Sequence, residues 1–134
     1  MKPGRVLVVD DHEPWRRQLS SLVERTGQWQ IVGEAVDGLD AIAKAATVKP
    51  DLILLDVHLP SLNGLKAARR IVAADPAARI LFISAHYERD IIAAAMSTGA
   101  CGYILKTNVA HELLPAMAAI RNGEQFITTA GRES

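Results

Sequence analysis

Residues 52–64 read LILLDVHLPSLNG, an apolar run that stops at Asp56 and gives way to a loop with proline, asparagine and glycine. Three other apolar runs also end at polar groups that can bind phosphate or a metal, namely Asp10 with Asp11, Ser84, and Lys106. If these runs are neighbouring parallel strands, their carboxyl ends meet at one edge of the sheet, where open α/β sheets bind ligands. The sequence therefore predicts that carboxylates, a hydroxyl and an ammonium share one crevice.

Short apolar segments alternate along the chain with segments of helical period. The segments predicted as strands are Val6 to Val9, Gln30 to Val36, Leu52 to Leu55, Ile80 to Ile83 and Cys101 to Leu105. Three of them lack an alternating polar face, which is typical of strands covered on both sides. Five apolar stripes of helical spacing follow them in turn. This alternation predicts an α/β fold: a doubly wound, five-stranded parallel sheet in the order 2-1-3-4-5, with five helices on both faces.

Pro115 conflicts with this pattern, because it stands about two turns into the last helix and lacks a backbone donor. It predicts a kink or a late start of that helix. The remaining 124–134 segment is too short for another domain, so we expect one domain over residues 1–123 and a short tail.

Composition narrows the class of protein. Among 134 residues, fifteen basic side chains balance fifteen acidic ones, which argues against an unaided DNA-binding module. No segment approaches the roughly 18 apolar residues of a membrane span. A lone cysteine, Cys101, fits a reducing compartment. We expect a soluble, cytoplasmic protein without a membrane partner.

Asp10, Asp11 and Asp56 offer hard oxygen ligands that suit Mg²⁺. Three crowded carboxylates repel one another unless a cation is present. The alternative is that Asp10 and Asp11 only cap the next helix, as aspartate often does. Two adjacent aspartates, with a third expected on a neighbouring strand, favour the metal site over the capping role. Asp37 also follows a strand, but the predicted order places that strand at the sheet edge, so we assign it a turn or capping role.

Lys106 and Ser84 both have ordinary explanations, since most lysines are solvated and serine is common in turns. Lys106, however, directly follows an apolar run at the ligand edge. An ammonium there can pair with a carboxylate at rest and with phosphate oxygens after a transfer.

The whole set resembles the receiver domain of bacterial response regulators: Asp10-Asp11, the motif from Asp56 to Gly64, Ser84-Ala85 and Lys106, in this order. The resemblance runs from about Arg5 to Gly123 and implies a flavodoxin-like, receiver-like fold. Gly102 to Lys106, His111 to Leu114 and Asn122 to Glu124 are most similar to the NarL/FixJ (LuxR-type) subgroup. In that subgroup a helix-turn-helix DNA-binding domain usually follows, so the tail is expected to begin a linker to a domain that is missing here.

The resemblance implies a two-component signalling role. Asp56 is then the phosphoacceptor for a histidine kinase, and Lys106 and the Ser84 hydroxyl hold the phosphoryl oxygens. The magnesium ligands are expected to be Asp11, Asp56 and the backbone carbonyl of His58, with Asp10 acting through water.

Other positions are expected to transmit or tune the signal. In the family, the aromatic residue at Tyr103 turns inward as the hydroxyl at Ser84 moves. His58 and His86 occupy places that in this family influence phosphoryl lifetime, so our hypothesis is that they tune it; the alternative is that both are exposed loop histidines without such a role. The expected output is a changed surface or a homodimer, with DNA contacted only through the missing domain. Thr107 stands where many relatives have proline after a cis bond, so the geometry of that bond is left open.

Several alternatives stay open. The chain is not expected to be an enzyme beyond its own phosphorylation and dephosphorylation, but a small aspartyl-phosphate phosphatase is the enzymatic alternative. A stand-alone receiver that acts by protein–protein interaction is another. A flavin-binding flavodoxin is a third, which the absence of flavin absorbance would dismiss. Dinucleotide binding is unsupported, because the first strand is not followed by a Gly-x-Gly-x-x-Gly motif.

Overall fold

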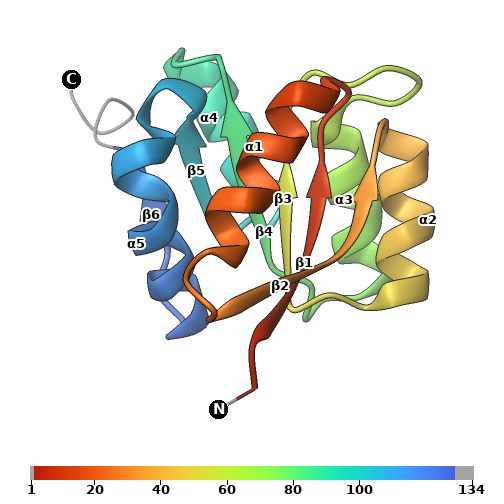
Figure 1. Ribbon diagram of the computed structural model, residues 1–134. Coiled ribbons are helices and arrows are strands. Elements are labelled where there is room, and N and C mark those ends of the chain that lie inside the picture. The colour runs from red at the N-terminus through yellow and green to blue at the C-terminus, as the bar shows by residue number, and fades with distance from the viewer. Residues whose placement is uncertain (1, 129–134) are drawn as a thin grey trace.

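The computed structural model describes residues 2–128 and shows helices packed around a central sheet (Figure 1). Strands and helices alternate in the order β1 (Gly4–Val9), α1 (Glu13–Glu24), β2 (Trp29–Ala35), α2 (Gly38–Val48), β3 (Leu52–Leu55), α3 (Gly64–Ala74), β4 (Ile80–Ser84), α4 (Arg89–Met96), β5 (Gly102–Leu105), the 3₁₀ turn η1 (Lys106–Asn108), α5 (Val109–Arg121) and β6 (Phe126–Ile127).

All strands are parallel, in the order β2-β1-β3-β4-β5-β6. The predicted parallel α/β sheet with five helices is confirmed, but the sheet has six strands rather than five. The sixth lies in the segment predicted to be a tail. Its two residues carry too little periodicity to be read as a strand. The last residues of that tail, 129–134, lie outside the described part of the chain.

The edge strand β6 is held to β5 by backbone hydrogen bonds. The amide of Phe126 donates to the carbonyl of Cys101 at 3.2 Å, and the amide of Thr128 donates to the carbonyl of Tyr103 at 2.7 Å. Gly102 permits this approach, because a Cβ atom there would lie 2.6 Å from the carbonyl oxygen of Phe126. Absence of a side chain at this position is therefore a condition for the sixth strand.

Two apolar layers cover the sheet, with α1 and α5 on one face and α2, α3 and α4 on the other (Figure 1). Leu19 and Leu113 pack in the first layer, and Ile71 and Ile92 pack in the second. Every residue of β3, β4 and β5 is buried. Burial on both sides explains why these strands read as continuous apolar runs.

Helix α5 begins at Val109 and continues through Pro115. Of the two predicted consequences of Pro115, the late start is therefore wrong, and a kink stays a prediction. Val109 and Leu113 are already buried against the sheet, ahead of the proline. Pro115 itself is exposed. Packing of the first turn against the sheet therefore sets where the helix begins.

Over residues 2–128, the structure contains no helix with the length and apolar character needed to span a membrane.

Candidate functional site

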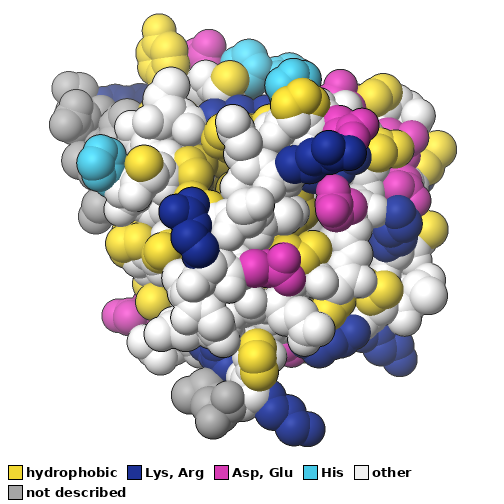
Figure 2. Space-filling view, in the orientation of Figure 1, with side chains coloured by type: hydrophobic (Ala, Val, Ile, Leu, Met, Phe, Trp, Pro, Cys, Tyr) yellow, Lys and Arg dark blue, Asp and Glu magenta, His cyan; other side chains and the backbone are white. Residues whose placement is uncertain are grey.

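Three carboxylates lie together at the carboxyl edge of the sheet. Asp10 follows Val9 of β1, and Asp56 follows Leu55 of β3; these two strand residues pair in register. One oxygen from each of Asp10, Asp11 and Asp56 lies within 4.8 Å of the others. Asp10 and Asp56 are 2% and 7% exposed, whereas Asp11 is open to solvent. This edge is uppermost in Figure 2, which shows acidic and histidine side chains there.

Lys106 joins the two buried carboxylates. It begins η1 directly after β5, and its Nζ lies 2.9 Å from Oδ2 of Asp10 and 3.2 Å from Oδ2 of Asp56. Burial alone would lower the pKa of Lys106, but the contacts with Asp10 and Asp56 outweigh it, so the pKa is raised. The lysine therefore remains an ammonium at neutral pH.

The charge on Asp56 is only partly compensated. Burial raises the pKa of Asp56, Lys106 opposes this, and the nearby Asp10 raises it further; the net pKa lies above the ordinary value. The one ammonium contacts two of the three clustered carboxylates. Oxygen donors with excess negative charge are the environment that a hard divalent cation such as Mg²⁺ prefers, so these residues fit such an ion.

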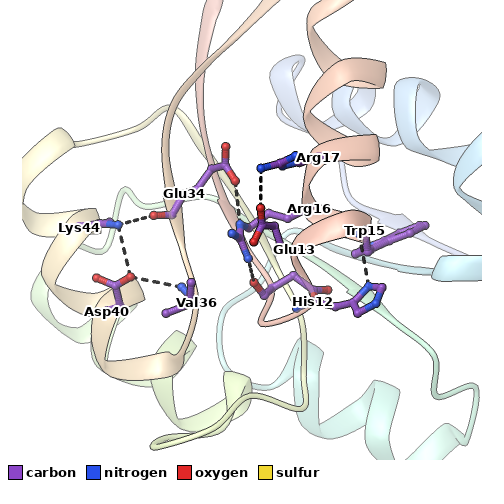
Figure 3. A network of polar contacts seen from close by, with 10 residues as sticks. His12, Glu13, Trp15, Arg16, Arg17, Glu34, Val36, Asp40 and Lys44 are labelled. Carbon is purple, nitrogen blue, oxygen red and sulfur yellow. Dashed lines mark hydrogen bonds and ion pairs between the residues drawn. The ribbon is translucent and has the colours of Figure 1, made fainter.

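The start of α1 keeps these aspartates available. The residue that caps this helix is His12, whose Nδ1 accepts a hydrogen bond from the Trp15 amide at 3.3 Å. Asp10 instead accepts the His12 amide at 2.9 Å. Arg16 reaches back to donate to the Asp10 carbonyl at 2.8 Å. It also donates to Glu34 at 2.7 Å, as Figure 3 shows. The alternative role of Asp10 and Asp11 as helix caps is therefore filled by His12, which the sequence pattern did not single out.

Ser84 ends β4 and is fully buried. Its hydroxyl accepts the amide of His86 at 3.1 Å, which turns the following loop. The rings of His58 and His86 meet edge to face with centroids 4.1 Å apart, so the loops after β3 and β4 touch through these two side chains. The sequence placed both histidines near the site but did not indicate that they contact each other.

Tyr103 of β5 is also fully buried, with its ring centroid 6.2 Å from that of Phe82. Burial is the main cause that raises the pKa of its hydroxyl, opposed by a hydrogen bond with the Ser84 side chain. The phenol therefore stays protonated at neutral pH and can act as a donor.

Asp37 lies outside this site, and its predicted capping role is confirmed. One carboxylate oxygen accepts the Asp40 amide at 2.7 Å, and the other accepts the Ser61 hydroxyl at 3.2 Å. The open question after Lys106 is also answered. No peptide bond within the described residues is cis, so the bond that joins Lys106 to Thr107 is trans.

Residues 6–118 match the response regulator receiver domain. The chain belongs to the response regulator receiver family. It is 32% identical over 124 residues to the response regulator UvrY of Escherichia coli and 36% identical over 120 residues to the response regulator VraR of Staphylococcus aureus. These alignments cover 92% and 90% of this receiver and 57% of each relative.

Solved structures give the same result. A two-component response regulator of the LuxR family from Aurantimonas superposes with a TM-score of 0.94 at 32% identity, covering 97% of this receiver and 93% of that chain. The predicted resemblance to the NarL/LuxR subgroup is thereby confirmed. The receiver spans a little over half the length of the curated relatives that it matches.

Proposed function

We propose that this receiver is a phosphorylation switch in which Asp56 accepts a phosphoryl group from a phosphohistidine of a histidine kinase. The observation that carries the proposal is the position of Lys106, whose Nζ bridges Asp56 and Asp10 at the mouth of a three-carboxylate cluster. A buried nucleophile, a fixed ammonium and a cation-binding cluster are the parts that phosphoryl transfer to a carboxylate requires.

In the proposed reaction, an oxygen of Asp56 attacks phosphorus, the P–N bond to the donor imidazole breaks, and the imidazole leaves. Lys106 is already within contact distance of the attacking carboxylate and is placed to neutralise charge on the transferred group. The Ser84 hydroxyl, which now serves its own loop, is proposed to turn to a phosphoryl oxygen. The protein contributes position and electric field, while the donor contributes the reactive bond.

Magnesium is the proposed cofactor. Asp11, Asp56 and the backbone carbonyl of His58 would hold the ion, with Asp10 contributing through water. When bound, it neutralises negative charge on the nucleophile and on the transferred oxygens. The cluster of three carboxylate oxygens within 4.8 Å of one another supports this assignment. Burial is the main cause that raises the pKa of Asp56, and the nearby Asp10 raises it further.

The central test is incubation with Mg²⁺ and acetyl phosphate followed by intact mass measurement. We expect a single added phosphoryl group that is acid-stable and base-labile, and its loss in Asp56→Asn. Asp37→Asn is the matched control, since Asp37 also follows a strand but serves as a helix cap that asparagine can replace. Equal labelling of Asp56→Asn and the parent would overturn the assignment.

For the output, we propose a change of the surface around β5 and its neighbouring helices, or a change of dimer state. New contacts to the phosphoryl group would draw in the loops that carry Ser84 and Lys106. Tyr103 is the proposed link, since it lies on β5 and reaches the loop after Ser84. Because curated relatives are longer, control of a following helix-turn-helix domain is the proposed use. We propose that the receiver acts in the cytoplasm, alongside its kinase and DNA.

Two other functions make different predictions. A stand-alone receiver would bind a protein partner when phosphorylated, without any DNA-binding segment. An aspartyl-phosphate phosphatase would release phosphate from an ester continuously, whereas the switch gives a single transfer followed by slow decay. Steady-state phosphate release therefore separates the enzyme from the switch.

A further inference from the structure

The ammonium of Lys106 has a third partner besides the two carboxylates. Its Nζ lies 5.5 Å from the ring centroid of Trp15, a residue in the first turn of α1. That distance is within the range of cation–π attraction. The same nitrogen is 2.9 Å from Asp10 and 3.2 Å from Asp56, so an aromatic face and the acidic cluster hold one cation between them.

Trp15 is fixed relative to the acidic cluster by short-range contacts. Its amide donates to Nδ1 of His12, and the His12 amide donates to the Asp10 carboxylate. The neighbouring Arg16 ties the same turn to the Asp10 carbonyl. Figure 3 shows the Trp15 indole extending from this turn away from Arg16 and Glu34. The backbone that carries the indole therefore belongs to the same rigid unit as Asp10.

The indole also lines the outer side of the site. A groove of about 770 Å³ runs between α1 and the start of α5, with Trp15, Lys106 and Val109 among its lining residues. The Lys106 side chain is 25% exposed. Trp15 thus contacts Lys106 at the point where the lysine side chain reaches the surface.

Packing alone does not account for a tryptophan here. Its indole nitrogen is buried, and no group within residues 2–128 forms a hydrogen bond with it. A buried donor without a partner is destabilising. A leucine would bring no such donor, and contact with the Lys106 cation is the feature that only the aromatic ring supplies.

We propose that Trp15 is a positioning residue that holds the Lys106 ammonium ready for the phosphoryl group. The inference rests on the proposed function of Lys106. In the resting receiver the two carboxylates orient the lysine, but one of them, Asp56, loses its carboxylate charge when it is phosphorylated. The attraction of an aromatic face does not depend on those charges, and a ring does not compete for phosphoryl oxygens. Trp15 therefore limits the freedom that a flexible lysine side chain would otherwise regain.

The kinetic test compares Trp15→Leu and Trp15→Phe in phosphorylation by acetyl phosphate with Mg²⁺. We expect Trp15→Leu to slow labelling of Asp56 by about two- to fivefold, and Trp15→Phe to recover much of the rate because it keeps an aromatic face. Trp29→Leu is the matched control. It removes the other tryptophan–cation pair, formed with Arg121 at 5.0 Å and unconnected to the acidic cluster, and should leave the rate unchanged.

The spectroscopic test leaves Trp15 in place and uses Trp29→Phe, so that Trp15 is the one remaining tryptophan. Adding beryllium fluoride and Mg²⁺ should change the Trp15 emission, and Asp56→Asn should abolish that change. This arm applies even if Trp15→Leu does not fold.

Failure of the inference can be told from failure of the proposed function. If the parent is labelled at Asp56 while Trp15→Leu reacts at the parental rate, or Trp15 emission is unchanged, the role of Trp15 is refuted alone. A slow Trp15→Leu that Trp15→Phe does not rescue also refutes it and indicates a packing effect. If the parent itself is not labelled, the proposed function is what fails.

Discussion

The hydroxyl of Tyr103 donates a 2.6 Å hydrogen bond to the backbone carbonyl of His86. The amide of the same His86 donates to the Ser84 hydroxyl at 3.1 Å. Ser84 at the end of β4 therefore holds the amide of His86, and the buried Tyr103 side chain of β5 holds its carbonyl. A movement of the Ser84 hydroxyl toward a ligand would release the amide of His86, the residue whose carbonyl Tyr103 holds.

Tyr103→Phe tests this link. The ring and its burial are kept, but the hydrogen bond to the His86 carbonyl is lost. We expect the free energy of unfolding to fall by about 1 kcal/mol. Amide hydrogen exchange should accelerate in residues 85–88 and remain slow in β1 and β3. Unchanged exchange in this loop would show that the hydroxyl does not hold it.

Asp56→Asn should stabilise the receiver when no divalent cation is present. The pKa of Asp56 is raised in the folded protein, mainly by burial, so the folded chain binds this proton more tightly than the unfolded chain does. Stability therefore falls as pH rises from the ordinary pKa of 3.8 through the raised folded value, and this loss persists at neutral pH. Asparagine carries no charge and so avoids this loss of stability. Each kcal/mol gained in the free energy of unfolding should raise the melting temperature by about 3 to 6 °C.

The measurement is urea or thermal unfolding of parent and Asp56→Asn in chelator at several pH values. The difference should be largest near neutrality and should shrink as the pH falls toward 3.8, where the carboxyl group of the parent is protonated. A constant difference across this range would mean that its cause is something other than the charge.

Magnesium should raise the melting temperature of the parent receiver. At a concentration 100 times the dissociation constant, a ligand that binds only the folded state adds about 2.7 kcal/mol. Asp11→Asn should remove most of this gain with little effect in chelator, because Asp11 is exposed and belongs to the carboxylate cluster. Asp37→Asn should keep the full gain; an equal loss in both variants would contradict a site at Asp11.

His58 and His86 are predicted to tune the lifetime of the phosphoryl group. Their rings are in contact, two residues after Asp56 and two after Ser84. We expect His58→Ala and His86→Ala each to shorten the lifetime, because water gains access to the acceptor. Since the rings touch, the two substitutions should not act independently. The fold-change in decay rate of the double variant should differ from the product of the two single fold-changes. Decay followed by intact mass at the parental rate in both single variants would refute the prediction.

Gly102→Ala should displace β6. The new methyl group would lie 2.6 Å from the Phe126 carbonyl oxygen and 2.9 Å from a methyl group of Leu81. Overpacking of this kind costs about 1 to 3 kcal/mol. Amide exchange at Phe126 and Thr128 should become fast, because the first amide donates to Cys101, just before β5, and the second to Tyr103 of β5. Thr128→Val is the comparison variant, because it removes only the hydroxyl contacts of Thr128 with Asn108 and Glu112 and adds no atom between β5 and β6. Retained protection in Gly102→Ala would show that β6 tolerates the methyl group.

The order of the strands and helices could be predicted from the sequence because burial leaves a local record. A strand covered on both faces reads as an unbroken apolar run, as in Leu52–Leu55, and the residue that follows it must lie at the sheet edge. The positions of Asp10, Asp56, Ser84 and Lys106 could be anticipated for that reason. Strand β6 could not, since two residues that pair with an existing edge leave no periodic pattern.

Contacts between distant side chains were decided by the tertiary structure alone. Nothing in the local pattern of α1 distinguishes Trp15 from an ordinary core residue, yet the packing of α1 beside the start of α5 brings its ring to Lys106. The same holds for the rings of His58 and His86 and for the Tyr103 hydroxyl that meets the His86 carbonyl. Periodicity determines which face of an element is buried, whereas the partner of each side chain depends on how the elements pack in three dimensions.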